Sequence, residues 1–589
     1  MRAFVSRVLP WLVLAGLAAY IAGMALFFPD FFEDNRYNLG VVRRSVLPQA
    51  RSFLESSCIT IHFQKLPIPR VEDWHRGLSM ILLVLFARAV GPGSETLLRV
   101  PHLVWLGAWI ALALLIFRRL QARGELNPDE DRLKAELQTP PKGGTTCQDR
   151  LKAGLQTNTD RLKAELRTPP EGGTTCQIRL PFAWCAAILI PALVLQPWLM
   201  LVLRRAFLDD VPAAACILLA FYLLVRSDEL RLRLVAVVGA LCGLGFVMKD
   251  MFLLWAPLGG LLLLVLGVVQ HRWRSARVIA AGLAVFAVGF MAVATPRLLW
   301  TRAELGVMLP TGSTYWNNCH FFGTRPYDSH YPFWLEGDTS YTSRVAVAGG
   351  LVPAIKNLAS RSGPYLKRAV DELSYLGLLF IPLLLAPRGA LRWSRKEKLV
   401  LTGGVATLFA FLGFCSLGFT VATELRYMVV PVTLVVVVGV KKLLDLLSTS
   451  SCLLGGWRGG LRLIVLAVLF GYLYVRPQLV AYYLTNRDCP PLSADMIQRL
   501  TRELRDGESA LLGTQGGIYY FSLHPEQRVL TFDRLQLAAL DAAKMRRLLG
   551  EYQVGAALLT HPGSIENLEA LGYREIARKG PEVLFDCRK

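Results

Sequence analysis

Two adjacent carboxylates follow the first long apolar run of the chain, and a catalytic site could be built around them. The run covers residues 9–28, and Glu33-Asp34-Asn35-Arg36-Tyr37 comes shortly after it. A carboxylate can accept a proton from a reacting group, but a charged side chain also costs little free energy at a membrane interface. The two acids are therefore either part of a site or ordinary interfacial residues.

Three later apolar runs also carry ionisable residues at their ends. These residues are Asp209 with Asp210, Lys249 with Asp250, and Glu424 with Arg426. Interfacial snorkelling explains any one of them taken alone. If the topology brings all four charged ends to one side of a membrane, they can form a single site that contains both carboxylates and cations.

The composition indicates a membrane protein. Of the 589 residues, 53% are hydrophobic and 19% are charged, which is too apolar for a soluble chain. No small-residue cleavage site follows the first apolar run, so we expect a retained anchor with a cytoplasmic N-terminus. The net charge of +21 is expected to lie in cytoplasmic loops facing anionic lipid. Membrane lipid is therefore an expected partner, and nucleic acid is not.

Hydropathy predicts about eleven membrane spans. They cover residues 9–28, 98–117, 181–203, 211–225, 232–248, 252–269, 278–299, 373–385, 399–420, 427–440 and 461–475. Clusters of Lys and Arg follow alternate spans, at residues 226–233, 271–277, 388–398 and 441–442, as the positive-inside rule requires. This topology predicts that all four charged ends lie on the extracytoplasmic side, together with the loop 300–371 and the C-terminal segment.

Four segments are expected along the chain. Residues 1–117 hold the first span, a long extracytoplasmic loop and the second span; the apolar piece Leu78–Val90 in that loop is too short to cross a bilayer. Residues 118–180 are a cytoplasmic insertion in which residues 131–148 recur almost verbatim at 160–177, and we assign no chemistry to them. Residues 181–480 form the transmembrane core, and residues 490–589 form a separate extracytoplasmic domain.

The C-terminal segment has the pattern of a small α/β domain. Strand-like runs at 509–513, 528–532, 555–560 and 583–585 alternate with helical stretches at 494–505 and 535–549. The glycine-rich residues 513–517 could cradle a phosphate, although a turn at the end of a strand is the better interpretation. Cys489 and Cys587 bracket the segment and could form a disulfide in an oxidising compartment.

The order of these motifs resembles that of the polytopic GT-C glycosyltransferases that use polyprenyl-phosphate sugars, the group of the protein O-mannosyltransferases and the lipid A aminoarabinose transferase. The resemblance covers most of residues 1–440 outside the insertion. The matching residues are Glu33-Asp34-Asn35-Arg36-Tyr37 for an Asp-Glu-x-x-Tyr motif, His75-Arg76-Gly77 for a His-Pro-Pro element that here lacks its prolines, Ser94-Glu95 with Arg99-Val100-Pro101, Asp210-Val211-Pro212, residues 243–249, and Arg426-Tyr427 with Pro431.

The resemblance implies a polytopic α-helical membrane protein that transfers a sugar from a polyprenyl-phosphate donor to an acceptor hydroxyl. The site would face the extracytoplasmic side of a bacterial inner or plasma membrane, and the acceptor would be a protein, a lipid or a glycan. The implied catalytic residues are Glu33, Asp34 and Asp210; the spacing to Tyr37 favours Glu33 as the base, whereas residue type favours Asp34. The implied ligands of the donor phosphate are Lys249, Arg426 and Arg36, with Tyr37, His75, Arg99, Tyr427, Arg204 and Arg205 as further candidates.

Cations fixed by the protein could stabilise a leaving phosphate without a metal, so we expect no cofactor, with a divalent metal ion as the alternative. His320 and His330, near Cys319 and Asp328, match no standard metal-site spacing. Aromatic residues within 311–334 suit sugar stacking and a membrane interface equally well. The competing function is transport of a lipid-linked substrate by a flippase without chemistry, which would favour charges near mid-membrane and internally repeated halves.

Overall fold

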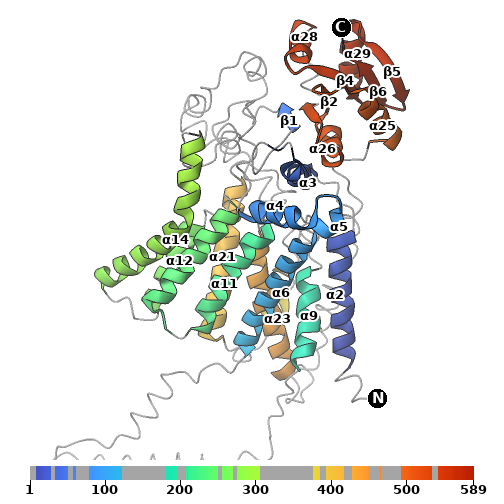
Figure 1. Ribbon diagram of the computed structural model, residues 1–589. Coiled ribbons are helices and arrows are strands. Elements are labelled where there is room, and N and C mark those ends of the chain that lie inside the picture. Colours follow the sequence, from blue (N-terminus) through green and yellow to red (C-terminus); the bar gives the residue numbers. More distant parts are fainter. Residues whose placement is uncertain are drawn as a thin grey trace, which may run out of the picture.

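The computed structural model describes residues 8–27, 33–48, 50, 58–61, 78–121, 181–194, 207, 210–227, 229–249, 255–269, 275–305, 376–377, 379–384, 393–416, 428–449, 464–465, 492–532 and 542–588. Within these ranges the chain forms a bundle of apolar helices. Beyond one end of the bundle lies a smaller unit built on a six-stranded sheet (Figure 1). We call this smaller unit the α/β unit.

The helices of the bundle follow the predicted spans, with described ends that differ from the predicted ones by up to nine residues. They are α2 (Leu9–Phe27), α6 (Val100–Gln121), α9 (Phe182–Val194), α11 (Asp210–Arg226), α12 (Leu232–Met248), α13 (Trp255–Val269), α14 (Ala276–Leu305), α21 (Arg395–Ser416) and α23 (Val429–Thr449). Of the predicted span 373–385, the short helix α20 (Ile381–Leu384) is described, and most of 461–475 lies outside the described residues. The number of spans therefore stays a prediction.

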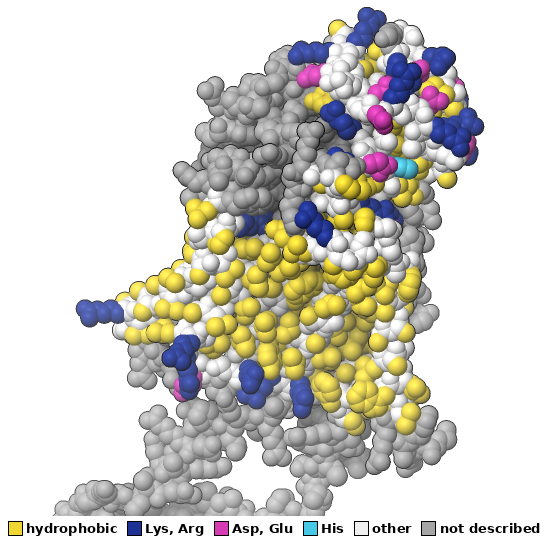
Figure 2. All heavy atoms as spheres, viewed as in Figure 1, with side chains coloured by type: hydrophobic (Ala, Val, Ile, Leu, Met, Phe, Trp, Pro, Cys, Tyr) yellow, Lys and Arg dark blue, Asp and Glu magenta, His cyan; other side chains and the backbone are white. Residues whose placement is uncertain are grey.

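The outer surface of the bundle suits a lipid environment. Among the residues that the structure describes, three helices are long and apolar enough to cross a membrane: Leu9–Phe27, Glu95–Gln121 and Ala276–Leu299. Figure 2 shows hydrophobic side chains spread over the visible side of the bundle, whereas Lys, Arg, Asp and Glu gather on the α/β unit and at the far end of the helices. The protein is a polytopic α-helical membrane protein with a small C-terminal sheet.

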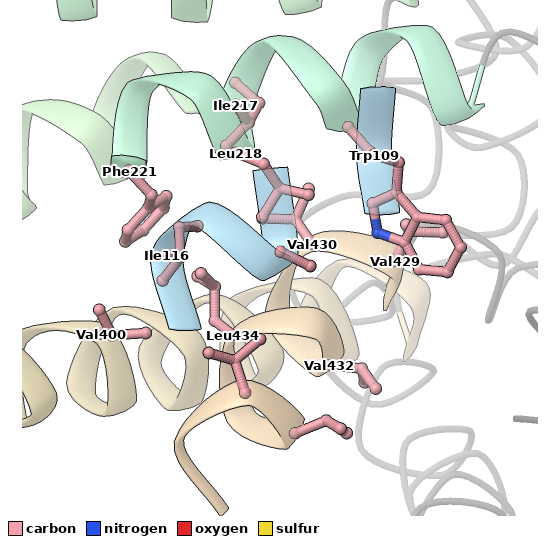
Figure 3. Packing of buried hydrophobic residues seen from close by; sticks show 14 of the residues in the cluster. Trp109, Ile116, Ile217, Leu218, Phe221, Val400, Val429, Val430, Val432 and Leu434 are labelled. Carbon is pink, nitrogen blue, oxygen red and sulfur yellow. The ribbon is translucent and has the colours of Figure 1, made fainter. Parts of the chain in front are cut away.

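The core of the bundle lies where α6, α11 and α23 meet (Figure 3). Trp109 of α6 is 1% exposed, and its indole Nε1–H donates a 2.9 Å hydrogen bond to Thr433 Oγ1 of α23. Because this bond satisfies the polar atom of the indole inside an apolar core, the large ring can be buried without an unpaired donor. The same hydrophobic cluster contains Ile217 and Leu218 of α11 and Val430 of α23.

Glycines allow α12 and α14 to touch along their backbones. A Cβ atom added at Gly239 of α12 would overlap the carbonyl oxygen of Phe286, and one added at Gly289 of α14 would overlap that of Ala236. Gly243, one turn after Gly239, faces the carbonyl of Phe290 in the same way. Small residues spaced by four are a common means of close helix packing in membranes, and they fix the position of the α12 C-terminus.

A buried ionic cluster joins α21 to α23 at the end of the bundle remote from the α/β unit. The carboxylate of Glu397 contacts Lys441, and its Oε2 lies 2.7 Å from Lys442 Nζ. Ser394 and Glu397 form a capping box, in which the Ser394 N–H donates to Glu397 Oε2 and the Glu397 N–H donates to Ser394 Oγ. Glu397 and Lys442 are each 1% exposed, so this cluster is part of the packed interior.

The α/β unit is a sheet with helices on both faces. The strand order is β1-β3-β2-β4-β6-β5. The pairs β1–β3, β3–β2 and β2–β4 are parallel, and the pairs β4–β6 and β6–β5 are antiparallel. Its C-terminal elements are α25 (Ala494–Glu503), β2 (Ser509–Gly513), α26 (Thr514–Leu523), β3 (Arg528–Phe532), α28 (Ala542–Glu551), β4 (Val554–Leu559), α29 (Pro562–Ala570), β5 (Arg574–Lys579) and β6 (Glu582–Asp586). Gly513 is both the last residue of β2 and the N-cap of α26, so the strand is followed directly by the helix, and residues 514–517 of the glycine-rich stretch form the first turn of α26.

The sixth strand comes from the other end of the chain. Strand β1 (Cys58–Ile61) belongs to the loop that follows the first span, and it pairs in parallel with β3 in the register Cys58↔Val529 to Ile61↔Phe532. The same loop contains α3 (Glu33–Val46) and α4 (Leu78–Val90). Figure 1 shows α4 lying across the ends of the bundle helices and α3 between α4 and α26. Residues 490–589 therefore do not form the sheet alone.

Cys587 is buried, and Cys489 lies outside the described residues, so the pairing of these two cysteines stays a prediction.

Candidate active site

The two adjacent acids, Glu33 and Asp34, are the first two residues of α3. Glu33 and Asp34 begin the helix, where carboxylates are favoured by the positive end of the helix dipole. The positions of their side chains lie outside the described part of the chain. The placement of these acids is therefore set by α3, and the contacts of α3 are the structural basis of the site.

Arg36 and Arg99 share one carboxylate. Arg36 Nη1 lies 3.0 Å from Glu95 Oε2, and Arg99 Nη2 contacts Glu95 Oε1. Arg36 is 6% exposed and Arg99 is 2% exposed. Glu95 belongs to the four-residue helix α5 (Glu95–Leu98), whose N-cap Ser94 accepts a hydrogen bond from the Leu97 N–H. Arg36, Glu95 and Arg99 thus form an ionic triad that anchors α3 to the start of α6.

Phe207 links this triad to the start of α11. Its carbonyl oxygen accepts a 2.6 Å hydrogen bond from the Asn38 side chain on α3, and its ring lies 6.0 Å from the guanidinium carbon of Arg99. Arg99 Nη1 also donates to the Ala25 carbonyl near the end of α2. Phe207 precedes Asp210 by three residues, so the triad and the α11 N-terminus are tied together. Sequence patterns gave no signal for Asn38 or Phe207.

Asp210 and Lys249 form a buried ion pair. Lys249 Nζ lies 2.7 Å from Asp210 Oδ1, and the two side chains are 12% and 2% exposed. Asp210 is the first residue of α11, and Lys249 is the C-cap of α12. Each charge therefore lies at the end of its helix where the dipole stabilises it, and the pair fastens the two helix ends together. The resemblance had implied separate roles for them, Asp210 as a catalytic residue and Lys249 as a ligand of the donor phosphate.

Of the charged helix ends, the described residues Asp210 and Lys249 lie at the same end of the bundle as Arg99. At the opposite end, Arg119 Nη2 of α6 donates to the carbonyl of Arg226, the last residue of α11. Because α6 and α11 meet at their C-termini there, their N-terminal residues Arg99 and Asp210 are at the other end, which Lys249 shares through its ion pair. The α/β unit contacts this end through α3 (Figure 1).

Arg297 is a buried cation that sequence reasoning missed. It lies within the apolar helix α14, is 8% exposed, and donates a 2.5 Å hydrogen bond from Nη1 to the Val247 carbonyl. Its guanidinium carbon lies 5.7 Å from the ring centre of Phe246. Arg297 therefore binds the C-terminal turn of α12, two residues before Lys249. A charged residue inside a predicted span is the signal that could have identified it.

Tyr37 has a packing role in the structure. Its side chain is 5% exposed and belongs to a hydrophobic cluster with residues of the α/β unit; its ring lies 5.8 Å from that of Phe521. Several other candidates lie outside the described residues, namely His75, Asp209, Asp250, Arg204, Arg205, His320, His330, Glu424, Arg426 and Tyr427. Their predicted roles stay predictions. Among the described residues, no group of three or more His, Cys, Asp or Glu side chains could hold a metal ion.

Comparison with known proteins identifies the fold. No protein-family model and no curated protein matches the sequence. Two solved structures of ArnT from Cupriavidus metallidurans are similar. The one bound to undecaprenyl phosphate is 13% identical, with a TM-score of 0.55 over 98% of each chain. The one in the apo state is 14% identical, with a TM-score of 0.50 over 100% of this chain and 99% of that chain. The chain thus has a GT-C-type fold, and the fold prediction is confirmed.

Proposed function

We propose that this protein is a membrane glycosyltransferase that transfers a sugar from a polyprenyl-phosphate donor to an acceptor hydroxyl. The observation that carries the proposal is the set of charged residues at one end of a GT-C-type bundle: the N-terminus of α3, the Arg36–Glu95–Arg99 triad and the Asp210–Lys249 pair. The ArnT structure with undecaprenyl phosphate supports a polyprenyl-linked donor by analogy of fold.

The reaction needs a base and a stabilised leaving group. Glu33 or Asp34 takes the proton of the acceptor hydroxyl while the hydroxyl oxygen attacks the anomeric carbon of the donor sugar. The bond between that carbon and the phosphate oxygen breaks, and polyprenyl phosphate leaves with the bonding electrons. Arg36, Lys249 and Arg426 stabilise the negative charge that develops on the phosphate, Arg by a bidentate fork and Lys as a point charge. Attack opposite the leaving phosphate inverts the anomeric configuration.

The position of the charges at a membrane surface suits this substrate. A polyprenyl chain stays among the lipid tails, and its phosphate and sugar lie at the interface. Charged residues cost little free energy there, whereas at the bilayer centre they cost about 2.5 kcal/mol or more each. The alternation of basic clusters between spans supports an extracytoplasmic site. The acceptor stays open among protein, lipid and glycan.

The proposal is tested by sugar transfer in membranes that contain the protein. A panel of radiolabelled polyprenyl-phosphate monosaccharides is supplied, and Glu33→Gln, Asp34→Asn and Arg426→Ala are compared with the wild type at matched expression. Removal of the base should lower turnover by about 100- to 10,000-fold. Glu229→Gln is the matched control, because Glu229 lies in the exposed turn between α11 and α12 at the other end of the bundle.

Turnover of one donor that a single carboxylate variant abolishes would establish the reaction and identify the base. If no donor is consumed, or if all variants match the control, the proposal is wrong. Movement of a lipid-linked substrate between the leaflets would then be the activity to measure.

A further inference from the structure

One face of α3 is occupied by the α/β unit. Its residues recur at helical spacing and are Arg36, Tyr37, Gly40, Arg43 and Arg44, each of which contacts α26 or the turn after it. The opposite face of α3 packs on α4 through Leu39 and Val42. Helix α3 is therefore held between the membrane bundle and the α/β unit, although it belongs in sequence to the first loop.

The contact between α3 and α26 is close in its centre. A Cβ atom added at Gly40 would lie 2.5 Å from ring carbons of Phe521, a residue that is fully buried. The Tyr37 ring packs against the same phenylalanine. Glycine at position 40 thus permits an approach that any larger residue would prevent, and the distance between α3 and α26 is set by backbone against ring.

Two further contacts fix the direction of α3. Arg43 Nη1 donates a 2.5 Å hydrogen bond to the carbonyl of Ser522 in the last turn of α26, where a cation is favoured by the helix dipole. Arg43 Nε also donates to the carbonyl of Pro92, just before α5. The pairing of β1 with β3 holds the chain that follows α3. The loop is therefore attached to the α/β unit at several independent positions.

Arg36 is the residue of α3 at which this docking meets the site. Its guanidinium carbon lies 5.7 Å from the ring centre of Tyr519 on α26, and its Nη1 is paired with Glu95 of the bundle. The side chain is thus placed between an aromatic ring of the α/β unit and a carboxylate of the membrane part. A cation over an aromatic ring is attracted by the electrons of the ring face, and this attraction limits the positions that the cation can take.

We infer that Tyr519 is a positioning residue that acts through Arg36, and that the α/β unit is a structural part of the active site. Helix α26 sets where α3 lies, and Tyr519 sets where the guanidinium of Arg36 lies. The inference rests on the proposed role of Arg36 as a ligand of the donor phosphate. It predicts that donor binding depends on a residue of the α/β unit that need not itself touch the donor.

The test compares Tyr519→Leu, Tyr519→Phe and Tyr573→Leu in the full-length protein. Tyr573 is a partly buried tyrosine that packs on the opposite face of the sheet, so its variant controls for general damage to the unit. Loss of the cation–π contact in Tyr519→Leu should raise KM for the donor by about 2- to 30-fold with little change in kcat. Tyr519→Phe keeps the ring face and should restore a KM close to that of the wild type.

A second pair of variants tests the docking itself. Gly40→Ala should push α3 away from Phe521 and raise hydrogen exchange of the α3 amides, and Gly40→Ala combined with Phe521→Leu should restore protection because the smaller side chain makes room for the methyl group. The inference is overturned if Tyr519→Leu leaves KM for the donor unchanged, if Tyr573→Leu raises it equally, or if Gly40→Ala leaves α3 protection as in the wild type.

A binding measurement distinguishes an error in the proposed function from an error in the inference about Tyr519. If the wild type turns over no donor, affinity for undecaprenyl phosphate is measured with the same variants by intrinsic tryptophan fluorescence. Weaker binding by Tyr519→Leu alone then supports the inference without catalysis, and equal binding by all variants overturns it.

Discussion

Removal of one partner of the Asp210–Lys249 pair should destabilise the end of the bundle that faces the α/β unit. The charged atoms are 2.7 Å apart, and at an effective dielectric constant of about 20 their gross attraction is about 6 kcal/mol. Much of this attraction is offset by desolvation, and loss of one partner of a buried pair typically costs about 3–5 kcal/mol. We expect Lys249→Met to fall at the lower end of that range, because the lysine keeps 12% exposure.

A double-mutant cycle separates the two roles of the pair. Lys249→Met, Asp210→Asn and the double variant are purified in one detergent, and their thermal unfolding and donor turnover are measured. The double variant should regain most of the stability lost by each single variant, since no charge is left buried without its partner. It should not regain turnover, because Lys249 is proposed to stabilise the leaving phosphate.

Two results would refute this reasoning. A double variant as active as the wild type would mean that Lys249 serves only to hold α12 against α11. Single variants with wild-type unfolding temperatures would mean that the ion pair does not stabilise the bundle.

Three further changes test the packing of the protein. Glu397→Gln should cost about 3 kcal/mol, because Lys441 and Lys442 are then left with the more exposed carboxylate of Asp445 alone. An unchanged unfolding temperature would contradict this. Gly239→Ala should cost about 1–3 kcal/mol by forcing α12 from α14, whereas Gly107→Ala, which meets no atom within 4 Å, should be nearly neutral in the same unfolding assay. Hydrogen bonds from Arg588 lower the pKa of Glu508. The stability that they contribute is therefore complete above the ordinary pKa of a glutamate, and it is lost as the pH falls through the lowered pKa. Glu508→Gln should make the unfolding temperature of the α/β unit depend less on pH over that acidic range.

Much of the bundle could be predicted from local sequence. Apolar runs of span length and the basic clusters between them identified helices such as α12 and α14 to within a few residues. Strands β2 and β3 could be predicted because they are continuous apolar runs between turns. Strand β5 was missed, because it is a largely charged edge strand without apolar alternation. Helix α3, assigned to a loop, was missed because its sequence is mostly polar.

The candidate site was predicted as a list of residues, and its arrangement was not. Charged residues at the ends of apolar runs drew attention to Asp210 and Lys249, but a sequence cannot reveal that the two share an ion pair. The same holds for Arg36 and Glu95, which lie 59 positions apart in the chain.

By itself the sequence determined which segments are apolar enough to enter a membrane and which residue types lie at their ends, since both follow from composition within one span. Only the tertiary structure decided that the first loop is built into the C-terminal sheet. Arg43 and Ser522 are 479 positions apart, and β1 pairs with β3 over a similar separation. Such contacts form because the chain folds back on itself to satisfy the backbone of an edge strand and to bury one face of α3, and no local pattern records where that return takes place.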